Sequence, residues 1–139
     1  MNNTRIFSYA SRLREAGNAF LLAELAKAGL RDFAPSHGDI LHHLLAGTEL
    51  NMSELALRTR RTKSTVTALV TKLERGGYVE RIPDPRDSRG VRVRLTDKGR
   101  ALEPAFQAIS AGLQELITSR LSEDEAERLE ELLARCVQD

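Results

Sequence analysis

The sequence contains no tryptophan, and aromatic residues make up only 4% of its 139 positions. Proteins that stack the bases of single-stranded nucleic acid need aromatic side chains, so we do not expect that kind of binding. A single cysteine excludes an internal disulfide and is typical of a reducing, cytoplasmic environment. No apolar run approaches the roughly 20 residues that span a bilayer. Arg12, Arg14 and Glu15 interrupt the N-terminal region, so a signal peptide is not expected either.

Patterns typical of catalysis and of metal binding are also missing. No nucleophile and base, phosphate-binding loop or pair of carboxylates occurs at a spacing that chemistry would require, so we predict neither an enzyme nor a cofactor. His42 and His43 are adjacent and point in different directions from one helix, and the His-x-x-x-His spacing does not occur. We therefore expect no metal site.

Charge is present in abundance but is unevenly distributed. The net charge is only +1, yet residues 51–100 carry 13 lysines and arginines against 6 acids, while the rest of the chain carries 8 against 14. Phosphate contacts dominate the sequence-independent part of DNA affinity, so the basic segment favours a nucleic-acid partner. Taken alone, such a cluster could equally be a solvated face.

Hydrophobic periodicity predicts mostly helices. We expect one helix over residues 6–28 that ends at Gly29, and a second that begins at Pro35 and ends at Gly47. A short third helix opens at residues 52–56, with Ser53 as its N-cap. The expected core stripe of the fourth helix, before the Gly76-Gly77 stop, consists of Val66, Leu69, Val70 and Leu73.

The opposite face of this fourth helix is small and polar in its first turns. Such a face can approach base edges, where hydroxyls bond to bases or phosphates and methyl groups touch thymine. An ordinary solvated helix face would look similar. The predicted DNA-contacting residues of this helix are Ser64, Thr67, Ala68, Thr71 and Arg75.

A basic β-hairpin follows this helix. Strand residues are expected at Tyr78–Ile82 and, with strict alternation, at Val91–Leu95. The turn between them, residues 84–90, carries Arg86 and Arg89, which suit a narrow minor groove. Asp87 is expected to brace this wing, through an arginine or through loop amides. Helix, turn, helix and hairpin together predict a winged helix-turn-helix.

The C-terminal part is predicted to be helical as well. Thr96 is expected to cap a long helix through residues 102–117, bent by Pro104, and Ser122–Glu125 forms a capping box for the last helix. The terminal helices are apolar on faces that the central module hardly covers, which predicts a two-fold homodimer. Such a dimer places two helices in successive major grooves, so we expect a pseudo-palindromic operator.

The central segment resembles the MarR family of bacterial transcriptional regulators. The similarity is carried by residues 53–56, 63–67, 73–81, 84–89 and 95–100, in the family's order. It implies a mainly α fold with a small β-hairpin wing: a DNA-binding lobe at residues 35–99 between dimerisation helices at 1–34 and 100–139. It also implies a homodimeric regulator, usually a repressor, that binds a palindromic operator in double-stranded DNA and is commonly released by a small molecule.

The resemblance also implies roles for individual residues. Lys63, Ser64, Thr65 and Thr67 match positions where the recognition helix meets DNA, and Arg89 matches the arginine that enters the minor groove. Asp87 matches an acid that braces the wing. Peroxide-sensing members carry a cysteine in the first helix, which this sequence lacks, so thiol sensing of that kind is not expected.

Three residues remain to be interpreted. Cys136 lies on the apolar stripe of the last helix and is read as a buried structural thiol in preference to a redox switch. His37 and His42 are candidates for an effector pocket, on position alone. The alternative function is a winged helix that docks a partner protein, without DNA specificity.

Overall fold

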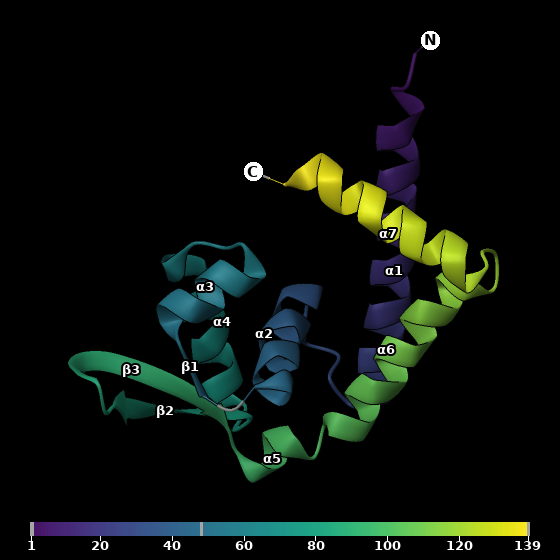
Figure 1. Ribbon diagram of the computed structural model, residues 1–139. Coiled ribbons are helices and arrows are strands. Elements are labelled where there is room, and N and C mark those ends of the chain that lie inside the picture. Colours follow the sequence, from purple (N-terminus) through teal and green to yellow (C-terminus); the bar gives the residue numbers. More distant parts are fainter. Residues whose placement is uncertain (1, 48, 139) are drawn as a thin grey trace.

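The computed structural model describes residues 2–47 and 49–138, which form helices and one small sheet (Figure 1). The lobe, defined here as α2–α4 and the three strands, lies on one side, and the arm, defined as α1, α6 and α7, lies on the other. This confirms the predicted mainly α fold with a β-hairpin wing. In chain order, the elements are α1 (Arg5–Lys27), α2 (Pro35–Ala46), β1 (Glu49–Asn51), α3 (Met52–Thr59), α4 (Lys63–Arg75), β2 (Val79–Asp84), β3 (Asp87–Leu95), α5 (Asp97–Arg100), α6 (Glu103–Thr118) and α7 (Glu123–Val137).

The lobe has a continuous apolar core. Val66, Val70 and Leu73, the predicted stripe of α4, are fully buried, and Leu69 packs against them from a partly exposed position. Fully buried side chains of α2, α3 and the sheet complete this core, and Leu25 extends it to the C-terminal end of α1. The core therefore fixes which face of α4 is turned outward.

The start of α3 differs from the prediction. Its N-cap is Asn51, whose side-chain Oδ1 accepts a hydrogen bond from Glu54 N at 2.8 Å, and Glu54 Oε1 accepts one from Asn51 N at 3.3 Å. Ser53, the predicted cap, lies inside the first turn. The reason is that the extended backbone of β1 runs directly into the helix, so the conformation that an N-cap needs falls on Asn51.

The sheet contains a strand that periodicity did not reveal. β1 pairs antiparallel with β3, with Leu50 opposite Val93, and the strand order is β1-β3-β2. Three residues are too few to show an alternating pattern. β3 also begins at Asp87 and not at Val91, so the predicted turn over residues 84–90 shortens to a tip at Pro85 and Arg86.

The predicted bend at Pro104 is wrong. Thr96 does cap a helix, and its Oγ1 accepts a hydrogen bond from Gly99 N at 3.2 Å, but that helix is the four-residue α5. α6 begins afresh at Glu103 with Pro104 in its first turn. A proline is well tolerated there because the first amides of a helix have no partner within the helix.

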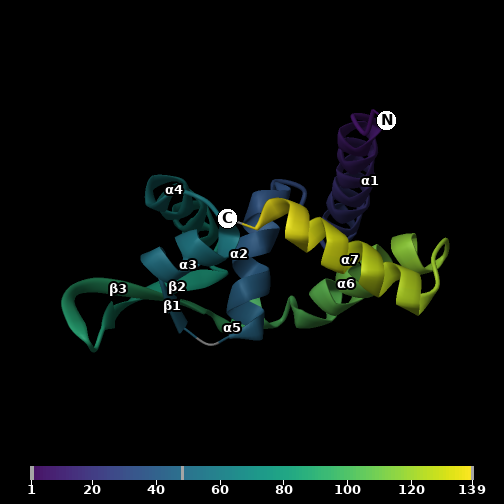
Figure 2. The ribbon, with the colours of Figure 1, turned by 45° about the horizontal axis from the view of Figure 1, so that its top comes forward.

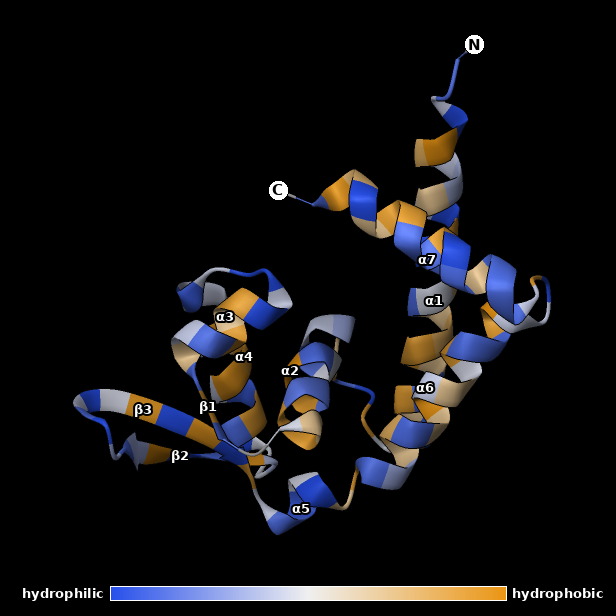
Figure 3. Cartoon of the chain, viewed as in Figure 1, coloured by the Kyte–Doolittle hydropathy of each residue, from blue (hydrophilic) through white to orange (hydrophobic). Residues whose placement is uncertain are grey.

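The arm leaves much apolar surface uncovered. The capping box of α7 is confirmed, since Ser122 Oγ accepts from Glu125 N and Glu125 Oε1 accepts from Ser122 N. Apolar residues recur along α1 and α7 in Figure 3, yet no described residue of α7 is buried. Cys136 is exposed, so the prediction of a buried thiol is wrong for the single chain, because no described element packs over this end of α7. Among the described residues, no helix is both long and apolar enough to cross a membrane.

Candidate nucleic-acid interface

The N-terminal turns of α4 form an exposed polar surface. Thr62 caps the helix, with its Oγ1 accepting from Thr65 N at 3.2 Å. This first turn is ordered by hydroxyl contacts, since Thr62 Oγ1 lies 2.9 Å from Thr65 Oγ1 and 3.1 Å from Ser64 Oγ. The predicted residues that are exposed here are Lys63, Ser64, Thr65, Thr67 and Ala68.

The middle of α4 is tied to the wing. Thr71 Oγ1 donates to Thr67 O at 2.8 Å and accepts from Arg81 Nη2 at 2.7 Å, and Arg81 also lies 3.6 Å from Glu74. The hydroxyl of Thr71, which is half-buried, is thus already engaged within the protein. Sequence reasoning missed Arg81, because only the tertiary structure brings β2 beside this turn of α4.

Arg75 lies at the other end of the helix. Twelve residues at 1.5 Å each separate it from Lys63, about 18 Å along the axis. There it lines a cleft of about 320 Å³ with Phe33, Lys72, Tyr78 and Lys98, between the end of α4 and the α1–α2 connection. Lys72 Nζ donates to Asp32 O across this cleft. The structure therefore does not bring Arg75 to the surface formed by the first turns.

Two aspartates shape the tip of the wing. Asp84 Oδ1 accepts from Arg86 N at 2.9 Å, and Asp87 Oδ1 accepts from Arg89 N at 3.0 Å. Both arginine side chains are exposed, and within residues 2–47 and 49–138 neither has a carboxylate within 4.0 Å. Asp87 thus holds a loop amide, while Arg86 and Arg89 keep their charges available to a partner.

The base of the wing contains a cluster of ion pairs that sequence reasoning missed. Arg92 Nη2 donates to Glu49 O at 2.7 Å, and its guanidinium lies 3.5 Å, 3.9 Å and 4.0 Å from the carboxylates of Glu49, Glu54 and Asp84. Arg94 pairs with Glu80 at 2.6 Å. These contacts join the wing to β1 and to the first turn of α3. The alternation of Arg92 and Arg94 with valines indicated a strand but not their partners.

His37 and His42 have different surroundings. His37 is buried, its ring stacks on Phe33 at 5.5 Å between centroids, and its Nδ1 accepts from Ala34 N at 3.0 Å. Burial, and then the nearby charge of Lys72, lower the pKa of His37 below its ordinary value. His42 is exposed. Neither lines the cleft beside Arg75, although Phe33, which contacts His37, does.

The exposed turns of α4 and the wing belong to one lobe. The β2–β3 hairpin projects beyond the helices of the lobe, on the side away from the arm (Figures 1 and 2). The arrangement combines a polar helix end with a projecting hairpin whose Arg86 and Arg89 have no ion-pair partner among the described residues. Such a pair of elements suits a helix in a major groove and arginines in the adjacent minor groove.

Comparisons with known proteins agree with this geometry. The sequence model of the MarR family matches residues 31–90. The chain is 32% identical over 114 residues to the exopolysaccharide II synthesis transcriptional activator ExpG of Rhizobium meliloti (strain 1021), covering 82% of this chain and 57% of ExpG. It is 32% identical over 103 residues to the uncharacterized HTH-type transcriptional regulator YkoM of Bacillus subtilis (strain 168), covering 74% of this chain and 67% of YkoM. The aligned regions thus span about half to two thirds of these curated relatives.

The fold is similar to that of a solved structure over almost its whole length. A crystal structure of a mutant MarR from E. coli complexed with operator DNA superposes with a TM-score of 0.85 at 25% identity, covering 97% of this chain and 95% of that one. The likeness therefore includes the arm as well as the lobe.

Proposed function

The chain belongs to the MarR family, and from that premise we propose that it is a transcriptional regulator which binds a specific sequence in double-stranded DNA. The observation that carries the proposal is that one lobe combines the exposed polar start of α4 with a wing whose exposed Arg86 and Arg89 make no ion pair within the described residues. The similar structure of MarR from E. coli, which contains operator DNA, supports it. The family and fold are those of transcription regulators and not of enzymes.

The proposed contacts differ between the two elements. The first turns of α4 read base edges in the major groove through Ser64, Thr65, Thr67 and Ala68, and Lys63 contacts a phosphate. Arg86 and Arg89 enter or flank the minor groove, where the negative potential is greatest. Thr71 and Arg75 contribute less than the sequence suggested, because one is bonded to Arg81 and the other lies at the far end of the helix.

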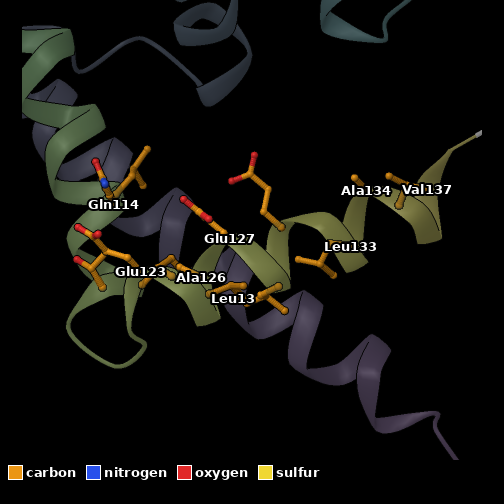
Figure 4. A pocket seen from close by; sticks show the side chains of 13 residues that line it. Leu13, Gln114, Glu123, Ala126, Glu127, Leu133, Ala134 and Val137 are labelled. Atoms are coloured by element: carbon orange, nitrogen blue, oxygen red, sulfur yellow. The ribbon is translucent and has the colours of Figure 1, made fainter.

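We propose that the chain acts as a homodimer joined through its arm. A groove of about 1060 Å³ runs between α1, α6 and α7, and its lining includes Leu13, Leu113, Leu129, Leu133 and Val137 (Figure 4). α7 carries six acids and two arginines, whereas α1 carries four basic residues and two acids. The α1 helix of a second copy therefore fits in apolarity and in charge. Two lobes related by a two-fold axis predict a pseudo-palindromic operator.

Control by a small molecule is the second part of the proposal. The cleft lined by Phe33, Lys72, Arg75, Tyr78 and Lys98 separates the end of α1 from the end of α4. A ligand bound there would change how the lobe sits on the arm, and hence the spacing of the two α4 helices. His37 stacks on Phe33, which lines this cleft, and so helps to hold the cleft in shape. His42 is exposed and does not line it.

We propose repression as the regulatory outcome. A dimer that covers an operator within a promoter blocks access of the transcription machinery, and its release by a ligand restores expression. A reporter gene placed behind the selected operator distinguishes the two signs of regulation, since loss of a repressor raises expression and loss of an activator lowers it.

Selection of bound sequences from random duplex DNA by the purified protein tests the function directly. We expect an enriched inverted repeat with half-sites about one helical turn apart, and an affinity that falls steeply as salt rises. The absence of an enriched sequence, together with no binding to any duplex at low salt, would favour the alternative of a protein-docking winged helix.

A further inference from the structure

A second basic surface lies beside the turn between α3 and α4. A hollow of about 560 Å³ is lined there by Ser53, Ala56, Leu57, Arg60, Arg61 and Lys63. Leu57 is 81% exposed, although Leu55, two positions earlier in the same helix, is fully buried. A large apolar side chain thus lines a basic hollow and lies outside the core.

The charges around this hollow are of one sign. Three of its six lining residues are cations and none is an acid. Arg61 is tied to the protein, with Nη1 2.9 Å from Asp39 Oδ2 and 3.2 Å from Thr59 O. Arg60 and Lys63 make no ion pair within the described part of the chain. α4, whose N-terminus carries partial positive charge, also begins here. The hollow therefore favours an anionic partner.

The backbone at Arg60 is unusual. Its φ of 54° places it in the left-handed region, and it is the only non-glycine residue with a positive φ in the described part of the chain. This conformation ends α3, a role that glycine fills at no steric cost. The chain carries an arginine at this position in spite of the strain, and this arginine lines the hollow.

We infer that this hollow binds the sugar-phosphate backbone of duplex DNA, with Arg60 and Lys63 at phosphates and Leu57 against the deoxyribose between them. The inference rests on the proposed function, because it adds a backbone contact to the same complex. The DNA backbone carries anionic phosphates separated by less polar sugars, and the lining of the hollow includes both cations and the apolar side chains of Leu57 and Ala56. The first helix of a helix-turn-helix crosses the DNA backbone while the second enters the groove, which favours backbone over bases as the partner of α3.

The variant Arg60→Gly tests the phosphate contact. Glycine accepts the left-handed backbone, so we expect the melting temperature to hold or rise. Affinity should fall about fivefold to tenfold at 0.1 M salt, and the slope of log K against log salt should shrink by about 0.9. The loss should be equal for the selected operator and for a mixed-sequence 30-base-pair duplex, since phosphates carry no sequence information. Arg100→Ala, which removes a charge from exposed α5, is the matched control and should change neither.

The variant Leu57→Ala tests the sugar contact. We expect affinity for both duplexes to fall about fivefold, through lost apolar contact, with the salt slope unchanged because no charge is removed. Thermal unfolding should be unaffected, since the side chain is already exposed. If the wild type binds duplex and both variants match it in affinity and slope, the inference is wrong while the proposed function stands. If the wild type binds no duplex at 50 mM salt, both fail together.

Discussion

At the scale of single residues, the wing depends on which of its arginines have partners. Arg92 and Arg94 are held by carboxylates at the base of the wing. Arg86 at the tip and Arg89 at the start of β3 donate their backbone amides to Asp84 and Asp87, and their side chains make no ion pair within the described residues. A side chain that is already paired must give up that partner to bind phosphate, and one that is unpaired need not. The same charge therefore has different consequences at positions a few residues apart.

The first prediction concerns Arg89. Arg89→Ala should weaken operator binding by about tenfold and reduce its salt dependence, because an exposed cation that contacts DNA is lost. Arg94→Ala removes the same charge from the same strand, but its guanidinium is paired with Glu80, so we expect a smaller effect. Fluorescence anisotropy titrations at several salt concentrations measure both. Equal affinities for Arg89→Ala and the wild type would exclude a minor-groove role.

The second prediction concerns pH. The pKa of His37 is lowered, so at a pH below the ordinary histidine value of about 6.5 the unfolded chain takes up a proton that the folded chain resists. The free energy of unfolding should therefore fall as pH drops from 7 through about 6.5 towards the pKa of the folded state. A protonated ring would also lose the Nδ1 acceptor that Ala34 N uses.

The variant His37→Gln separates the contribution of His37 to the pH dependence of stability from the contributions of other titrating groups. Glutamine offers an acceptor at the third helical position but does not titrate. The free energy of unfolding should therefore change less with pH in this variant than in the wild type. Part of the slope should remain, because burial and His42 also lower the pKa of His43. Urea unfolding at pH 7 and pH 5.5 measures it. A variant with the full wild-type slope would show that His37 is not responsible.

At the scale of elements, the first residue of a helix can be predicted from local sequence patterns in some cases and not in others. The capping box at Ser122–Glu125 was predictable because cap and acid lie within one turn of sequence. The start of α3 was not, because β1 had to be recognised before Asn51 could be seen as the cap. Pro104 was misplaced for a similar reason: periodicity across residues 102–117 does not show that the chain breaks after α5.

The third prediction tests the start of α3. Asn51→Ala should lower the free energy of unfolding by about 0.5–2 kcal/mol, since it removes the acceptor for Glu54 N. Ser53→Ala, two residues later in the same turn, should cost little because Ser53 does not cap the helix. Chemical denaturation of both variants is the measurement. A larger loss for Ser53→Ala than for Asn51→Ala would contradict the capping seen here.

At the scale of the whole molecule, the arm and the lobe differ in completeness. The lobe has a closed core of fully buried side chains, but Phe7 on α1 is 80% exposed and Val137 on α7 is 62% exposed. Exposed apolar residues are gathered on these two helices and around one groove, and this is the surface that the proposed homodimer would cover. The arm would then set the distance between two lobes, and each lobe would supply the DNA contacts.

The fourth prediction tests this role of the arm. Leu133→Glu places a charge in the groove beside Glu127 and Glu130, so it should shift the chain from dimer to monomer and lower operator affinity. Leu57→Glu adds the same charge to an exposed position of the lobe and should leave the oligomeric state unchanged. It is the control for oligomeric state alone, because Leu57 lies in the inferred DNA contact. Sedimentation velocity measures this. A wild type that sediments as a monomer at micromolar concentration would refute the proposed dimer.

Local patterns in the sequence determined the order of the helices other than α5, the hairpin, the outward face of α4 and the concentration of basic charge in residues 51–100. Each of these depends on residues only a few positions apart. Only the tertiary structure shows that Arg92 donates a hydrogen bond to Glu49, 43 positions away, and that Arg81 donates one to the hydroxyl of Thr71. It also shows that Leu57 is exposed and lines the same hollow as Arg60. Such contacts depend on how distant segments pack together, and no periodicity within one segment records that.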